Sequence, residues 1–106
     1  MNTRKVGKKL ENYVLEILQK TDSTAKLTNN SGAVSNNGDI QHKYFVCECK
    51  KRNTENVTID RKVWRKVCSQ IKIGSLKTPV LFLENMHNER FVVLELNDFA
   101  RLIEKE

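Results

Sequence analysis

Hydrophobic and polar positions follow two different periods along the chain, one typical of helices and one typical of strands. Apolar side chains recur every three or four positions in residues 4–20 and 59–73, which gives each segment one apolar face and predicts two helices. Gly74 is predicted to end the second helix. A third helix is expected near the C-terminus, capped by Asn97 or Asp98. Its inward-facing side chains are predicted to be Phe99, Leu102 and Ile103.

Five shorter segments are rich in strand-forming residues or are bounded by turn residues, and we predict them as strands. These segments are residues 24–29, 39–42, 44–50, 80–83 and 91–96. The second and third are expected to form a hairpin that turns near His42 and Lys43. The fourth is apolar throughout, which predicts a strand buried on both faces. The polar residues 29–38 are predicted to form a loop.

The resulting order is helix, three strands, helix, two strands, helix, which predicts an α/β domain with a mixed central sheet flanked by helices. A chain of 106 residues, 39% of them hydrophobic, is typical of a single domain spanning residues 1–106. It has no apolar run of roughly 20 residues and no secretory signal at its start, so we expect a cytoplasmic protein with no membrane partner. Its small size suggests a phage, viral or archaeal source.

Charge and cysteine content restrict the classes of function. Nineteen Lys and Arg against 13 Asp and Glu give a net charge of +6, which suits DNA or RNA as a partner, although an ordinary basic surface has the same composition. Cys47, Cys49 and Cys68 form no CxxC pair, and His42 and His87 stand at no zinc-site spacing. We expect reduced thiols that pack as small hydrophobic groups.

The residues most indicative of chemistry are Asp39 and the Glu48-Cys49-Lys50 segment. Side chains alternate between the faces of a strand, so Glu48 and Lys50 should point one way and Cys47 and Cys49 the other. A hairpin over residues 39–50 would bring Asp39 alongside Glu48. The alternative is a surface Glu–Lys pair and an unrelated aspartate in a turn.

Two carboxylates and a lysine at one place suit phosphodiester hydrolysis. Carboxylate oxygens are ligands for Mg²⁺, which polarises a phosphoryl oxygen and lowers the pKa of its bound water. A lysine orients or deprotonates that water and offsets the charge of the transition state. The pattern therefore predicts a metal-dependent nuclease, with Mn²⁺ able to substitute for Mg²⁺.

The same residues resemble the PD-(D/E)xK nuclease superfamily, and within it the archaeal-type and phage Holliday-junction resolvases. The matching features are Glu11 in the first helix, the Ser31-Gly32-Ala33 loop, Asp39 in Gly-Asp-Ile, and the strand that ends in Glu48-Cys49-Lys50. Gly38 stands where the superfamily usually has proline. The motif is degenerate, so the resemblance depends on the order and spacing of these residues over most of the chain.

The resemblance implies a restriction-endonuclease-like fold and a role for each matching residue. Asp39, Glu48 and the backbone carbonyl of Cys49 would be metal ligands, Lys50 the catalytic lysine, and Glu11 a ligand directly or through water. Ser31 or Ser35 would contact phosphate. The resemblance also implies a homodimer, because two active sites cut the two symmetric strands of a junction.

Basic residues near this motif are candidates for contact with the DNA backbone, a contact that positions DNA without reading its sequence. They are Arg4, Lys5, Lys8, Lys9, Lys51 and Arg52. A second basic group gives the helix after the motif a positive face, for which a solvated surface and DNA contact are equally expected. Its members are Arg61, Lys62, Arg65 and Lys66. Gln70 is more typical of a polar surface position than of a metal site, Trp64 of packing, and His42 of a turn.

Three functions remain open. The first is a structure-selective endonuclease acting on branched DNA, in particular a Holliday-junction resolvase. The second is a nuclease of the same fold with another substrate, such as a flap, a nick, or the target of a restriction or repair enzyme. The third is a nucleic-acid-binding module without catalysis, against which the full set of acidic residues and the lysine argues.

Overall fold

The computed structural model describes residues 3–28 and 39–104, and for residues 3–8 the backbone alone. Its centre is a five-stranded sheet in the order β1-β2-β3-β4-β5. The strands are β1 (Lys26–Leu27), β2 (Ile40–Gln41), β3 (Phe45–Lys51), β4 (Thr78–Glu84) and β5 (Arg90–Val93). Strands β3 and β4 pair in parallel, whereas the other neighbouring pairs are antiparallel, so the sheet is mixed as predicted.

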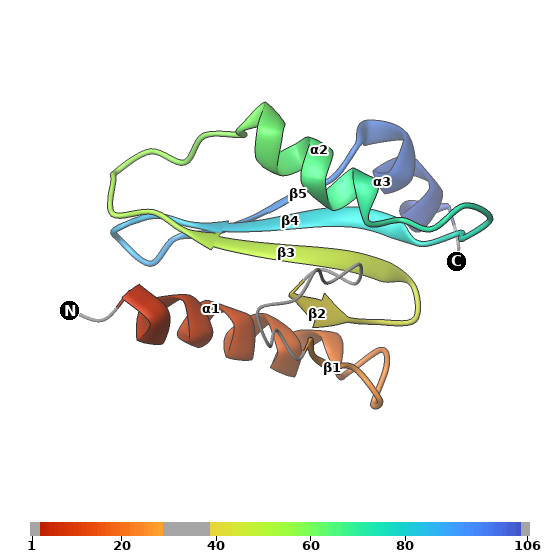
Figure 1. Ribbon diagram of the computed structural model, residues 1–106, viewed down its shortest axis with the longest axis horizontal. Helices are drawn as coiled ribbons and strands as arrows, with labels where there is room; N and C mark the ends of the chain where they lie inside the picture. The colour runs from red at the N-terminus through yellow and green to blue at the C-terminus, as the bar shows by residue number, and fades with distance from the viewer. Residues whose placement is uncertain (1–2, 29–38, 105–106) are drawn as a thin grey trace.

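Three helices accompany the sheet: α1 (Thr3–Leu18), α2 (Arg61–Ser69) and α3 (Leu96–Ile103). Helix α1 lies on one side of the sheet and α2 on the other (Figure 1). The order of helices and strands is the one predicted, and the α/β class is confirmed. Among the described residues, no helix is long and apolar enough to cross a membrane.

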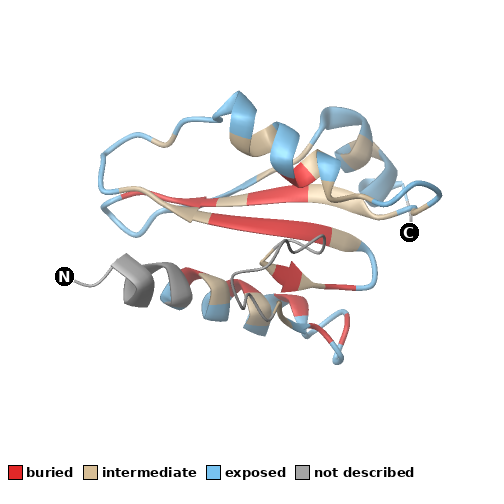
Figure 2. Cartoon of the chain, in the orientation of Figure 1, coloured by how far each residue is buried: buried red, intermediate tan, exposed pale blue. Residues whose placement is uncertain are grey.

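The core follows from the alternation of side chains along β3. Cys47 and Cys49 pack with Leu10, Val14 and Leu18, the apolar stripe of α1. The intervening residues of β3 face α2, whose Val67 is fully buried. Buried residues therefore run along the centre of β3 and β4, between the two helix layers (Figure 2). The three cysteines are free thiols, as predicted.

Both predicted ends of helix α2 are wrong. The helix begins at Arg61 and ends at Ser69 rather than spanning 59–73, and Gly74 lies beyond its end. The Gln70 N–H donates to the Val67 carbonyl at 3.3 Å, a tighter i to i−3 bond that ends the helix before the glycine is reached. Gly74 instead adopts φ +85° in the turn that leads to β4.

The C-terminal region differs most from the prediction. Strand β5 ends at Val93 rather than residue 96, and α3 starts at Leu96 after Glu95, so neither Asn97 nor Asp98 is its N-cap. The apolar stripe of α3 was expected to face inward, but none of its residues is buried. Its exposed apolar residues are Leu96, Phe99, Leu102 and Ile103.

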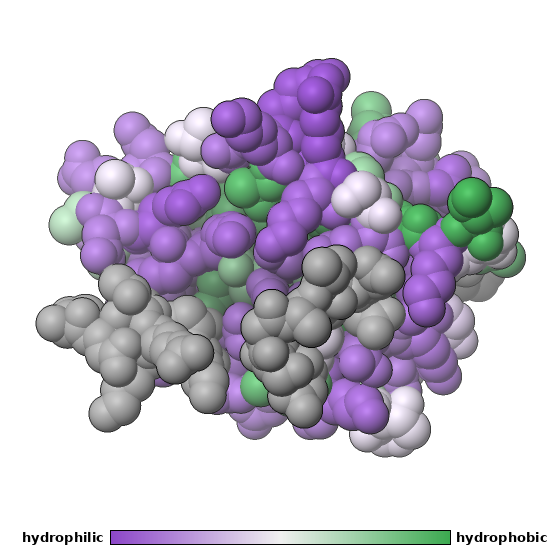
Figure 3. Space-filling view, viewed as in Figure 1, coloured by the Kyte–Doolittle hydropathy of each residue, from purple (hydrophilic) through white to green (hydrophobic). Residues whose placement is uncertain are grey.

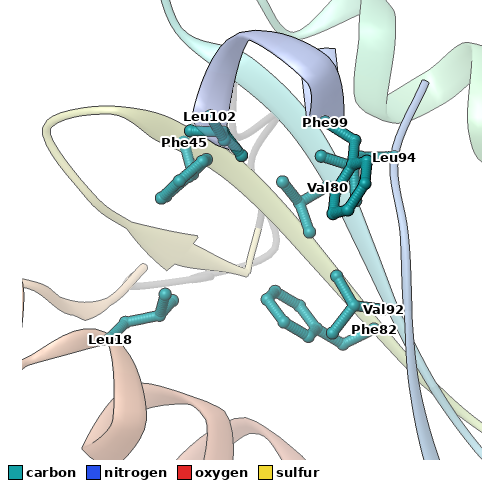
Figure 4. Close-up of a pocket in the computed structure, with 8 residues that line it drawn as sticks. All are labelled: Leu18, Phe45, Val80, Phe82, Val92, Leu94, Phe99 and Leu102. Atoms are coloured by element: carbon teal, nitrogen blue, oxygen red, sulfur yellow. The ribbon is translucent and has the colours of Figure 1, made fainter. Parts of the chain in front are cut away.

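An apolar hollow of about 430 Å³ separates α3 from the end of α1. Phe99 and Leu102 of α3 and Leu18 of α1 line it on the same face of the sheet (Figure 4). Its remaining lining residues come from the sheet and the segment after it: Phe45, Val80, Phe82, Val92 and Leu94. Helix α1 therefore covers only part of its side of the sheet.

Candidate active site

Strand β3 divides its side chains between two chemical environments. Cys47 and Cys49 face α1 and the apolar core. Glu48 and Lys50 face α2, with the Lys50 Nζ 3.9 Å from the Glu48 Oε1. The predicted alternation of this strand is confirmed, and it places the carboxylate and the lysine together.

The hairpin between β2 and β3 fixes Asp39. Ile40 is the partner of Cys47 in the antiparallel ladder, so Asp39 lies one position further along, beside Glu48. The Asp39 N–H donates to the Cys47 carbonyl at 2.7 Å, and the Asp39 Oδ2 accepts the Cys49 N–H at 2.8 Å. These two hydrogen bonds hold the Asp39 carboxylate against the edge of β3, as the hairpin prediction required.

Glu48 is a carboxylate in a largely dry environment. Its side chain is 3% exposed. Burial raises its pKa above the ordinary value of 4.5, and the neighbouring Asp39 raises it further, whereas Lys66 and Lys50 oppose the rise. The Lys66 Nζ, from α2, lies 3.4 Å from the Glu48 Oε1. Glu48 is therefore a buried acid acted on by one further carboxylate and two ammonium groups.

Cys49, the middle residue of the motif, is subject to the negative charge of the predicted acidic residues. Burial raises the pKa of its thiol, and the carboxylates of Asp39, Glu11 and Glu48 each raise it further. The charges of all three acids therefore act on one residue, although Glu11 approaches from α1 and Glu48 points toward α2. The raised pKa keeps the thiol protonated at neutral pH.

The oxygen atoms around Asp39 and Glu48 suit a hard cation. Within the described parts of the chain, no three His, Cys, Asp or Glu side chains form a ready-made metal cage. Mg²⁺ does not need one, since it usually keeps several waters and binds through one or two carboxylates. The Cys49 N–H points toward Asp39, and the carbonyl of the same residue lies on the same edge of the strand. These two carboxylates and that carbonyl are the groups that could hold a Mg²⁺ or Mn²⁺ ion.

The predicted DNA-binding residues differ in how accessible their side chains are. Lys9 is exposed on α1, and Arg52 is half-buried after β3. Lys51 faces away from Glu48, and its Nζ lies 3.0 Å from the Glu84 Oε1 and 2.8 Å from the Asn85 carbonyl. Its ammonium is thus held inside the protein. Other predicted residues lie outside the described residues or the described side chains: Ser31, Ser35, Arg4, Lys5 and Lys8.

The contact between Lys66 and Glu48 was not predicted from the sequence, which indicated only a basic face on this helix. The sequence feature closest to a signal for this contact is that Lys66 directly precedes Val67, the residue that anchors α2 on the sheet. Trp64 and Gln70 are partly buried on the same helix and at its end. His42 lies in the turn between β2 and β3, as predicted, and it is buried there, where its ring nitrogens bond the Thr21 hydroxyl and the Tyr44 N–H. Burial lowers its pKa.

Comparison with known proteins identifies no relative. The chain matches no protein-family model, no curated protein and no solved structure. Its function therefore has to be inferred from the geometry and chemistry of the residues described above.

Proposed function

We propose that the chain is a metal-dependent DNA endonuclease with a restriction-endonuclease-like fold, and that Asp39, Glu48 and Lys50 form its active site. The observation that carries the proposal is the convergence of Asp39 and Glu48 at one edge of β3, with the Lys50 Nζ 3.9 Å from the Glu48 carboxylate. The mixed sheet and the order of its helices and strands support the fold assignment.

Each residue has a distinct chemical task in this proposal. Asp39, Glu48 and the Cys49 carbonyl would hold Mg²⁺, which would polarise a phosphoryl oxygen and lower the pKa of a bound water. Lys50 orients the attacking water and offsets negative charge that develops on the phosphate. Glu11 acts on the same site from α1, directly or through water. The hydrogen bond from the Cys49 N–H keeps the Asp39 carboxylate in place before the ion arrives.

The basic surface supports a nucleic-acid substrate. Hydrophilic side chains dominate the face of the molecule shown in Figure 3. Helix α2 has four exposed basic residues that can contact phosphates: Arg61, Lys62, Arg65 and Lys66. Lys66 connects this helix to the active site through Glu48. We include Lys9 and Arg52 in the DNA-binding surface and leave out Lys51, whose ammonium is paired with Glu84.

We propose branched DNA, in particular the four-way junction, as the substrate, and this step depends on the resemblance to Holliday-junction resolvases. A junction has two equivalent strands to cut, so the proposal includes a homodimer. The exposed apolar stripe of α3 and the adjacent hollow support a second copy as the occupant of that surface, because monomeric proteins rarely expose large contiguous apolar patches.

A substrate panel tests the proposal. The chain is incubated with Mg²⁺ and labelled four-way junction, duplex, flap and single-stranded DNA. We expect paired symmetric nicks in the junction alone. Cutting of the other forms would instead favour a nuclease of the same fold with a different substrate. Binding without cutting in either Mg²⁺ or Mn²⁺ would contradict the catalytic assignment.

A further inference from the structure

Of the two lysines that the described residues place against the Glu48 carboxylate, Lys66 is the closer. Its Nζ lies 3.4 Å from the Glu48 Oε1, compared with 3.9 Å for Lys50. The two lysines come from different elements, Lys50 from β3 and Lys66 from α2. The same oxygen of Glu48 therefore faces two ammonium groups, one on the strand and one on the helix above it.

The surroundings of Lys66 allow its side chain to move. Val67, the next residue, is fully buried and anchors α2 on the sheet. The Lys66 side chain is 60% exposed, whereas that of Lys50 is 34% exposed and that of Glu48 only 3%. A long, largely exposed side chain has alternative rotamers that reach solvent, because only its ammonium group contacts Glu48. Glu48, in contrast, is fixed in the core.

A divalent cation and the Lys66 ammonium compete for the same place. Coordination through the Glu48 Oε1 puts a double positive charge within a few ångströms of an ammonium that already contacts that oxygen, and like charges at this range repel. Lys66 is the group free to leave. Its neighbours on the exposed side of α2 are also basic, so a phosphate there would meet several positive charges.

We propose that Lys66 is a displaceable counter-ion of Glu48. It pairs with the carboxylate while the metal is absent, and it turns outward to bind a DNA phosphate when the metal takes its place. The inference rests on the proposed function, and it couples metal binding to substrate binding through one side chain. The competing role is a permanent structural ion pair that the metal does not disturb.

Titration of the full chain with Mn²⁺ by calorimetry, without DNA, distinguishes these roles. We expect Lys66→Gln to bind Mn²⁺ about threefold to fivefold more tightly than the wild type, as expected for removal of a competing, partly exposed charge. Lys66→Arg keeps the charge and should resemble the wild type. Lys62→Gln is the matched control, because Lys62 is exposed one turn earlier and has no ion pair among the described residues. It should change the affinity less than Lys66→Gln does.

DNA affinity provides a second readout that needs no catalysis. Binding of a labelled four-way junction is measured with Ca²⁺ and with EDTA. We expect Lys66→Gln to weaken binding about threefold or more in Ca²⁺ and by a smaller factor in EDTA, because Lys66 reaches the phosphate only after the ion has displaced it. An equal loss under both conditions would contradict the exchange.

The outcomes separate this inference from the proposed function. Wild-type Mn²⁺ binding that is lost in Glu48→Gln, together with unchanged or weaker binding in Lys66→Gln, would overturn the counter-ion role and leave the nuclease assignment intact. Mn²⁺ binding to neither the wild type nor Lys66→Gln would overturn both. Binding only in Lys66→Gln would support the inference in its strongest form.

Discussion

At the scale of single residues, Glu48 occupies a position where packing alone would favour an apolar side chain. It is 3% exposed on the central part of β3, and its neighbours in the sheet include the fully buried Leu81. A buried charge is retained at a cost in folding free energy unless it is paired. The partial compensation by Lys66 and Lys50 fits a residue kept for its chemistry rather than for stability.

The raised pKa of Glu48 gives a stability prediction with a defined sign. An acid with a higher pKa in the folded than in the unfolded state favours folding below about pH 4.5, and that contribution is lost as pH rises through the folded-state pKa. We therefore expect Glu48→Gln to have a larger free energy of unfolding than the wild type at pH 7.5 and a smaller gain at pH 4.5. Urea denaturation at both values measures the difference. Equal gains at both pH values would be inconsistent with a shifted Glu48.

Lys51 provides a second test at this scale, because its position predicts a structural role. Its ammonium and the Arg90 guanidinium share the buried Glu84 carboxylate, at 3.0 and 2.6 Å. We expect Lys51→Ala to lower the free energy of unfolding by about 2 kcal/mol, since Arg90 still compensates part of the charge. Arg52→Ala, which removes no ion pair among the described residues, should change it by less than about 0.5 kcal/mol. A selective loss of junction affinity in Lys51→Ala, with stability unchanged, would restore Lys51 to the DNA-binding surface.

At the scale of the elements, the sequence predicts the first three-quarters of the fold better than its end. The hairpin register that places Asp39 beside Glu48 follows from strand alternation and a short turn, both of which are local. The start of α3 is set instead by where β5 leaves the sheet, and its apolar stripe packs on no described element well enough to bury a residue. The helical period predicts which apolar residues of α3 lie on one face, but not whether another part of the protein covers that face. Likewise, the position of Lys66 next to the apolar Val67 does not by itself show that the Lys66 side chain reaches from α2 to Glu48.

Helix α2 positions Lys66 near Glu48, so the N-terminal cap that stabilises this helix is a useful place to test its contribution to folding. Asp60 precedes the helix, and its side chain accepts the Lys62 N–H at 2.8 Å. We expect Asp60→Ala to lower the free energy of unfolding by about 1 kcal/mol, and Asp60→Asn to keep most of it, because asparagine also caps helices. Thermal denaturation should show a fall of roughly 4 °C for the alanine variant. Equal effects of the two substitutions would indicate that capping is not the mechanism.

At the scale of the whole molecule, the apolar surface around α3 bears on assembly. Leu96 and Ile103 are exposed, and Phe99 and Leu102 line the hollow beside Leu18 (Figure 4). We expect sedimentation equilibrium to give twice the mass of the chain, and Phe99→Glu to shift the protein toward the monomer, because a charge in a buried interface is strongly unfavourable. A monomeric wild type at micromolar concentration would contradict the homodimer.

The proposed active site hydrolyses DNA through the carboxylates beside β3, Lys50 and a metal ion. Its most direct test is single-turnover cleavage of a labelled four-way junction in Mg²⁺ by the wild type, Glu48→Gln and Lys50→Met, with EDTA as the metal-free control. We predict cleavage by the wild type in Mg²⁺ alone, and a rate at least about a hundredfold lower in each variant. Glu48→Gln is expected to fold at least as stably as the wild type, so a loss of cleavage in this variant cannot arise from unfolding. Wild-type rates in both variants, or no cleavage by the wild type, would contradict the account.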